Sequence, residues 1–140
     1  MSDPMTGRCL CGAVTFTATD VDTQVHSCHC GMCRRWSGGP AMSARAGNVR
    51  FENEDAIGVY PSSAWAERGF CKTCGTNLFY RMPQQGTTIL WLGGFDDPSG
   101  FELAGEIYID DKPDFYALAG DHPRQTGKEF LASIGMPTGD

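Results

Sequence analysis

Hydrophobic and polar residues alternate in several short segments of the chain, which is the period of half-buried β-strands. Val14 and Phe16 alternate with threonines, and Val49 and Phe51 alternate with Asn48 and Arg50. Further strand-like runs lie at residues 57–60, 78–80, 88–92 and 106–109. Turn-forming glycine, proline or aspartate separates some of these runs, at residues 82–86 and 95–100. The pattern predicts a mainly β protein.

One short helix is expected near the C-terminus. Thr126 and Glu129 have the spacing of a capping box, in which each side chain accepts a hydrogen bond from the other residue's backbone. An apolar face and two helix breakers follow, namely Phe130, Leu131 and Ile134, then Gly135 and Pro137. The helix is therefore predicted to begin after Thr126 and to end near Gly135.

Composition limits the classes of protein to which the chain can belong. Its 140 residues suit one domain over 1–140, and 41% hydrophobic with 20% charged residues excludes a disordered chain. The net charge of −6 disfavours a nucleic-acid partner. No apolar run approaches the ~18–20 residues of a membrane span. Residues 1–6 carry no export signal, so we expect a cytoplasmic protein that does not bind membranes.

The seven cysteines fall into three tight groups along the chain. The cytosol keeps thiols reduced, so such clusters indicate metal binding, not disulfides. Two groups supply a pair of thiolates each and are followed by a glycine that permits a sharp turn: Cys9 and Cys11 before Gly12, and Cys71 and Cys74 before Gly75. We predict that these four cysteines form one closed structural zinc site.

The middle group, Cys28, Cys30 and Cys33, supplies three thiolates, and no eighth cysteine exists to complete a tetrahedral shell. Three protein ligands with one open position are typical of catalytic zinc. An alternative is that His26, which shares the strand parity of Cys28, closes the site. His29 would point away from the metal if the segment is extended. The open arrangement predicts a second zinc ion, at which these cysteines are the catalytic residues.

An open zinc site with three thiolates favours sulfur chemistry, because zinc deprotonates a coordinating thiol. The expected reaction is addition of a small thiol to an electrophile. Arg34, Arg35 and Arg68 are candidates for binding the carboxylates of that thiol. The alternative for Arg34 and Arg35 is that they offset the charge of the thiolates or are simply solvated.

The three cysteine groups and their neighbours, at residues 7–16, 28–38 and 70–78, resemble the glutathione-dependent formaldehyde-activating enzyme family, to which centromere protein V is also related. Weaker agreement covers residues 60–63, Arg68 and 107–116. The resemblance implies a mainly β fold of the β-tent type, with twisted antiparallel sheets and two zinc ions. It also implies a carbon–sulfur lyase that interconverts glutathione plus formaldehyde with S-hydroxymethylglutathione, and it points to the same seven ligands.

Other interpretations of these motifs remain open. The chain could be a non-catalytic zinc module that binds a protein partner through a scaffold with two structural zinc sites. Either C-x-x-C pair could be redox-active, although no βαβ pattern surrounds them. The cysteines could also be inert, or bind iron. Trp36, Trp65 and Trp91 could line a pocket or belong to the core. His122, in an expected surface loop, is a weaker catalytic candidate.

Overall fold

The structure, a computed structural model, describes residues 3–136. The chain divides into two compact units: unit 1 comprises Met1–Thr23 and Ser43–Phe101, and unit 2 comprises Gln24–Met42 and Glu102–Asp140. Among the described residues, no helix is both long enough and apolar enough to cross a membrane. The expectation of one domain over 1–140 stays a prediction.

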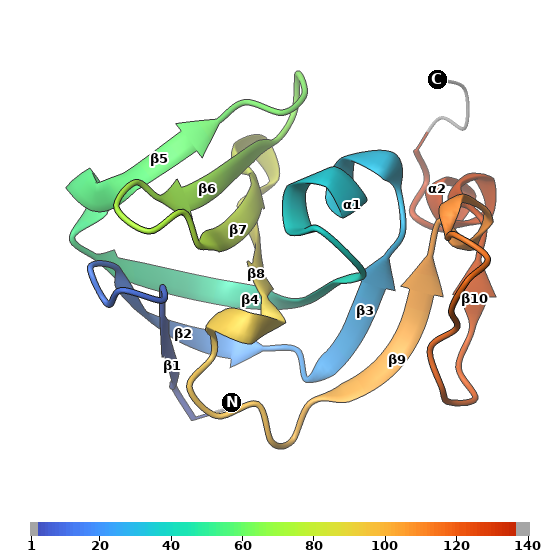
Figure 1. The fold of residues 1–140 in the computed structure, drawn as a ribbon, viewed down its shortest axis with the longest axis horizontal. Coiled ribbons are helices and arrows are strands. Elements are labelled where there is room, and N and C mark those ends of the chain that lie inside the picture. Colours follow the sequence, from blue (N-terminus) through green and yellow to red (C-terminus); the bar gives the residue numbers. More distant parts are fainter. Residues whose placement is uncertain (1–2, 137–140) are drawn as a thin grey trace. The chain divides into compact units, whose positions relative to one another are not determined.

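Unit 1 is built from antiparallel strands (Figure 1), and the alternating sequence pattern predicted several of these strands. Its strands are β1 (Met5–Arg8), β2 (Thr15–Val21), β4 (Ala41–Glu52), β5 (Ile57–Tyr60), β6 (Glu67–Cys71), β7 (Asn77–Met82) and β8 (Thr87–Trp91). They pair in the order β1-β2-β4-β8-β7-β6-β5. The connections include the 3-10 turns η1 (Glu54–Ala56), η2 (Pro83–Gln85) and η3 (Leu92–Gly94).

The core of unit 1 is apolar. Inward-facing residues of β2, β4, β7 and β8 form it, and they include Phe16, Ala44, Phe79 and Leu90, all nearly inaccessible to solvent. Phe16 packs edge-on against Phe95, with ring centroids 5.4 Å apart. Two of the cysteines, Cys9 and Cys71, belong to the same cluster.

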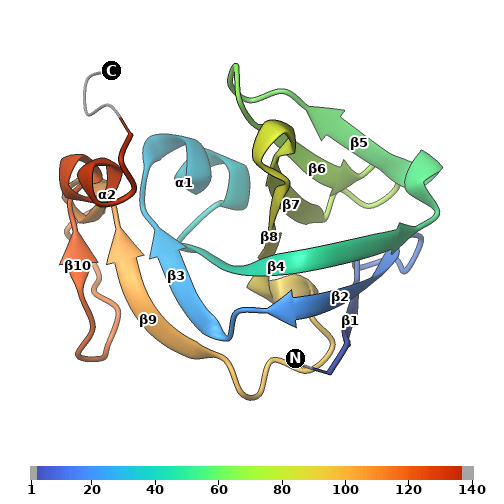
Figure 2. The same cartoon turned by 180° about the vertical axis from the view of Figure 1, so that it is seen from behind.

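Unit 2 contains parallel strands, which the prediction of antiparallel sheets missed. Strand β9 (Glu102–Ile107) lies between β3 (Gln24–Cys28) and β10 (Arg124–Gln125), and both pairings are parallel (Figure 2). A parallel pair needs a long connection, and here residues 29–101 separate β3 from β9. Local turn signals reveal hairpins only, so the sequence pattern gave no sign of this pairing. The fold is mainly β, and its sheet is mixed.

The described part of unit 2 also contains two helices, one of which was not predicted. Helix α2 (Gly127–Ser133) begins after Thr126 with the expected capping box, in which the Glu129 N–H donates to Thr126 and the Thr126 N–H donates to Glu129. Its expected final breaker, Pro137, lies outside the described residues. The additional helix α1 (Gly31–Ser37) follows β3, and a 3-10 turn η4 (Ile109–Asp111) follows β9. Helix α1 contains the third cysteine of the middle group.

Candidate metal and thiol-binding site

The four-cysteine group lies in unit 1, on two turns of similar design. The Cys9 N–H donates to the Val14 carbonyl, and the Gly12 N–H donates back to the Cys9 carbonyl. In the second turn, the Cys71 N–H donates to Thr76, and the Gly75 N–H donates back to Cys71. Gly12 and Gly75 have φ of 82° and 83°, the left-handed conformation that glycine adopts without strain. Local turn chemistry therefore orients both cysteine pairs.

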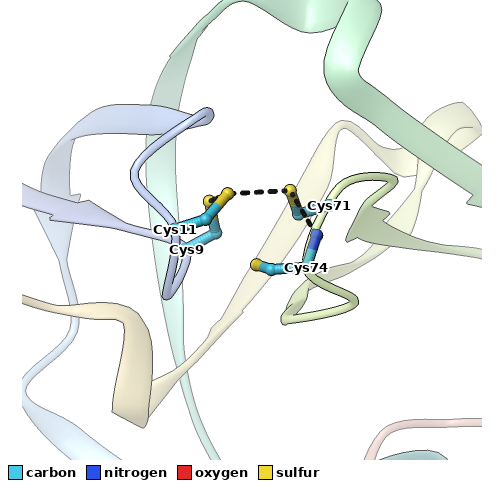
Figure 3. Close-up of side chains that lie close together, drawn as sticks. All are labelled: Cys9, Cys11, Cys71 and Cys74. Carbon is cyan, nitrogen blue, oxygen red and sulfur yellow. Dashed lines mark hydrogen bonds between the residues drawn. The ribbon is translucent and has the colours of Figure 1, made fainter.

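The two turns bring four sulfur atoms together (Figure 3). The Sγ atom of Cys11 is 3.7 Å from that of Cys9 and 3.8 Å from that of Cys71. Four thiolates around a tetrahedral zinc, with Zn–S bonds of about 2.3 Å, would have sulfurs about 3.8 Å apart. The spacing of the sulfurs therefore fits a zinc ion.

Backbone and hydroxyl groups stabilise negative charge on this group. The N–H groups of Val14 and Ala13 donate to the sulfurs of Cys9 and Cys11. Hydrogen bonds from the side chain and the backbone of Thr76 lower the pKa of Cys74 to about 5. Thr76 also joins the two turns, because its hydroxyl oxygen accepts a hydrogen bond from the Leu10 N–H at 3.0 Å.

Crowding of the thiols opposes full ionisation. The Ala13 N–H lowers the pKa of Cys11, but desolvation and the thiols of Cys9, Cys74 and Cys71 raise it to about 11. Thiolates at this spacing repel one another, so a cation among them would favour ionisation of all four. The arrangement is that of a group able to hold a thiophilic metal.

The three-cysteine group lies in unit 2, where β3 ends and α1 begins. Cys28 is the last residue of β3, Cys30 is the N-cap of α1, and Cys33 is buried in its first turn. Their Sγ atoms lie within 4.8 Å of one another. The Cys33 N–H donates to the Cys30 sulfur at 3.4 Å. Hydrogen bonds from the thiols of Cys28 and Cys33 hold the pKa of Cys30 below its usual range.

Neither neighbouring histidine joins this group. Within residues 3–136, its potential metal ligands are the three sulfurs alone. His26 is exposed and lies opposite Gly105 of β9, over which its ring packs. His29 is fully buried, and its Nε2 lies 2.7 Å from Glu106 Oε1. The structure therefore gives no support to closure of the site by His26.

A cleft of about 570 Å³ lies beside α1 in unit 2. Its walls include Arg34 and Arg35 from the helix, and Phe115 and Tyr116 from the C-terminal segment that follows η4 (the tail, residues 112–136). The Arg34 Nε donates to the His29 carbonyl at 3.0 Å, which fixes that guanidinium next to the cysteine loop. A cleft lined by two arginines suits a ligand that carries carboxylates.

The remaining candidates lie elsewhere. Arg68 is buried in β6 of unit 1, where its guanidinium carbon lies 5.1 Å from the centre of the Tyr80 ring. Its role in substrate binding stays a prediction. None of the three tryptophans is among the residues that line the cleft. His122 lies in a loop, as expected, but its side chain is only 6% exposed and contacts Glu106.

Sequence reasoning missed the buried carboxylate of Glu106. Its oxygens accept hydrogen bonds from His29 and His122, at 2.7 and 2.6 Å, and from Arg124 at 2.9 Å. Burial alone would raise the pKa of this carboxyl, but the two histidine bonds and the Arg124 charge lower it overall. The sequence offered one signal of this network, namely an acidic residue within a strand-like run. That signal did not indicate which residues the carboxylate contacts.

The fold and the cysteine groups define a mainly β protein with two sites suited to thiophilic metal ions. The family model described as "glutathione-dependent formaldehyde-activating enzyme" matches residues 4–111, a span that contains all seven cysteines. The chain belongs to this family, as the resemblance of its cysteine motifs predicted.

Two further comparisons agree with this placement. The chain is 35% identical over 133 residues to an uncharacterized lyase of Schizosaccharomyces pombe, and the match covers 91% of this chain and 95% of the yeast protein. A crystal structure of a Rhodobacter sphaeroides protein is similar with a TM-score of 0.54 and 21% identity, covering 86% of this chain and 99% of the other. At that identity the likeness concerns the fold alone.

Proposed function

We propose that the chain is a zinc-dependent carbon–sulfur lyase that joins glutathione, or a similar small thiol, to formaldehyde or a related aldehyde. Its membership of the formaldehyde-activating family and its lyase-named yeast relative support this proposal. The observation that carries it is the three-cysteine group, which offers three sulfurs and no further protein ligand among the residues described. A metal there would keep a position for a substrate thiol.

The proposed reaction forms one carbon–sulfur bond. The thiol releases its proton to solvent, the thiolate sulfur attacks the carbonyl carbon, the π electron pair moves to the carbonyl oxygen, and that oxygen takes up a proton from solvent. The product is the S-hydroxymethyl thioether, and the reverse direction is the lyase reaction. Zinc held by Cys28, Cys30 and Cys33 would supply the thiolate at neutral pH by lowering the pKa of the bound thiol.

The protein's own side chains would orient the thiol. Arg34 and Arg35 line the cleft, and Arg34 also donates to the carbonyl of His29, between Cys28 and Cys30. Their guanidinium groups can pair with the two carboxylates of glutathione. Phe115, 84% exposed at the cleft, offers an apolar surface to the peptide body. A cationic cleft in a chain of net charge −6 favours an anionic ligand over other small molecules.

The four-cysteine group has a different proposed role. Cys9, Cys11, Cys71 and Cys74 would hold a second zinc with a complete set of four thiolates, so this ion would be structural. The expected stoichiometry is therefore two zinc ions per chain, with one open to ligands.

Cobalt(II) substitution tests the proposal, because thiolate binding to cobalt alters its visible spectrum. We expect glutathione to change the spectrum of the cobalt in the three-cysteine group, and S-methylglutathione, which keeps both carboxylates but has no free thiol, to leave it unchanged. Cys30→Ser should remove the glutathione response. The protein should also accelerate adduct formation above the spontaneous rate, measured by NMR.

The contrary result is equally clear. If glutathione leaves the cobalt spectrum unchanged and the rate equals that without protein, the proposed enzyme is excluded. The chain would then be better described as a zinc module without catalysis.

A further inference from the structure

Each polar group of His29 makes a hydrogen bond, although neither ring nitrogen belongs to the three-cysteine group. Its N–H donates to the Ile107 carbonyl, and its carbonyl accepts from the Arg34 Nε, both at 3.0 Å. Its ring contacts Glu106 through Nε2 and Tyr116 through Nδ1, at 2.7 and 3.3 Å. Four contacts therefore fix the position of the residue between Cys28 and Cys30.

The partners of the ring indicate which of its nitrogens donates a hydrogen bond. An ionised carboxylate only accepts hydrogen bonds, so the His29 Nε2 donates to Glu106. In the neutral ring, Nδ1 is then an acceptor, and it is placed to receive the Tyr116 hydroxyl. The ring thus links the inside of unit 2 to Tyr116, a residue that lines the cleft.

Glu106 is the centre of this network. It is 1% exposed, and its two oxygens accept three hydrogen bonds from His29, His122 and Arg124. Arg124 also donates to the carbonyls of Leu118 and Gly120, which fixes the loop around the carboxylate. A buried charge with this many donors defines one position for the groups around it.

We propose that Glu106 is the positioning residue of the three-cysteine group, which it holds in its metal-binding geometry by fixing His29 between Cys28 and Cys30. The inference rests on the proposed metal-binding role of these cysteines. His122 and Arg124 hold the carboxylate, and Tyr116 holds the opposite side of the His29 ring. These three residues lie beyond residue 111, where the family match ends, so the tail completes the site in this chain.

The network explains why the three-cysteine group needs support from outside its own loop. Its cysteines come from a strand end, a helix cap and a helix turn, without the paired glycine turns that orient the four-cysteine group. Groups that hydrogen-bond around a metal site typically change metal affinity 10–100-fold when they are removed.

Glu106→Gln is the main test, because glutamine keeps the side-chain size but replaces one accepting oxygen with a donor. We expect cobalt(II) to bind the three-cysteine group about 10–100-fold more weakly, measured by chelator competition and by the visible spectrum. Affinity at the four-cysteine group should not change. Cys30→Ser identifies which spectral component belongs to which group.

Glu67→Gln is the matched control. It makes the same substitution in unit 1, where Glu67 accepts two hydrogen bonds from Arg81. This variant should bind cobalt at both groups as the unmodified protein does. Tyr116→Phe removes only the hydroxyl at the far side of His29, so we expect a smaller weakening at the three-cysteine group.

Because a buried carboxylate can be needed for folding, His122→Gln provides a second measurement that leaves the Glu106–His29 bond in place. If Glu106→Gln does not fold, weaker cobalt binding by His122→Gln at the three-cysteine group supports the proposal. A folded Glu106→Gln, or failing that His122→Gln, with unchanged affinity and spectrum at this group would overturn it. Since the readout is metal binding, absence of catalysis in the unmodified protein would leave this conclusion intact.

Discussion

The two cysteine groups differ in what holds them in place. In unit 1, two glycine turns orient four cysteines beside an apolar core that contains Phe16 and Leu90. In unit 2, the buried residues around three cysteines include His29 and Glu106. Local turns and apolar packing surround the first group, whereas we propose that the second depends on a buried polar network. The group proposed as a closed structural site and the group proposed as a substrate site thus differ in their surroundings.

Loss of one cysteine from each group gives the largest expected contrast. Structural zinc contributes about 10–16 kcal/mol in small zinc domains, which is comparable to the ~5–15 kcal/mol stability of an ordinary domain. Cys74→Ser should therefore unfold unit 1, seen as loss of the β-sheet circular dichroism. Cys30→Ser should lose one equivalent of zinc and all catalysis but keep that signal. A folded Cys74→Ser with two bound zinc ions would contradict the structural role.

Removal of a cleft arginine should affect substrate binding without affecting either metal. A hydrogen bond to a charged group contributes about 1.5–3 kcal/mol, so Arg35→Gln should raise KM for glutathione about 10–100-fold with little change in kcat. Arg50→Gln is the control, because Arg50 in unit 1 is 79% exposed in its side chain and its ion pair with Glu52 is long, at 3.8 Å. If the two variants had equal KM values for glutathione, Arg35 and the cleft that it lines would not be the binding site of the thiol.

Acid should weaken unit 2 through Glu106. Its pKa is lowered in the folded protein, relative to an ordinary value of 4.5, so the folded state binds fewer protons than the unfolded state near that pH. Its contribution to stability is complete above pH 4.5 and is lost as the pH falls through the lowered pKa. Carbon NMR of the labelled carboxyl measures this directly. A titration midpoint at or above 4.5 would be inconsistent with bonding to His29, His122 and Arg124.

The smallest effect is expected at the helix cap. Thr126→Ala removes the side-chain acceptor of the Glu129 N–H, and loss of such a cap costs about 1 kcal/mol. Urea denaturation should show this decrease, with zinc content unchanged at both groups. Ser133→Ala, at the last residue of α2, should change the stability by less than about 0.5 kcal/mol. A loss of zinc in Thr126→Ala would show that α2 supports the metal groups as well.

Several elements could be predicted because their signals are local. The alternation around Phe16 and Phe51 indicated β2 and the end of β4, and the Thr126 capping box indicated α2. Helix α1 was missed because its seven residues follow a cysteine N-cap and include no recognised start signal. The parallel pairing of β9 was missed because it joins distant segments of the chain.

Distance along the sequence alone does not explain what could be predicted. Cys11 and Cys71 are 60 positions apart, yet their meeting was predicted, because few side chains bind a thiophilic metal and the cysteine spacing leaves few combinations. His29 and Glu106 are 77 positions apart, and their contact was not predicted. A carboxylate can pair with many kinds of hydrogen-bond donor, so the presence of a glutamate in the sequence does not indicate which residue it contacts.

The sequence by itself therefore determined the two cysteine groups, their glycine turns and the mainly β character, since each depends on residue chemistry at fixed short spacing. Only the tertiary structure decided which buried groups surround the three cysteines. That choice depends on the parallel register of β3 and β9, which sets Ser27 and Cys28 opposite Glu106 and Ile107. Register is a property of the whole packed unit, and no local pattern encodes it.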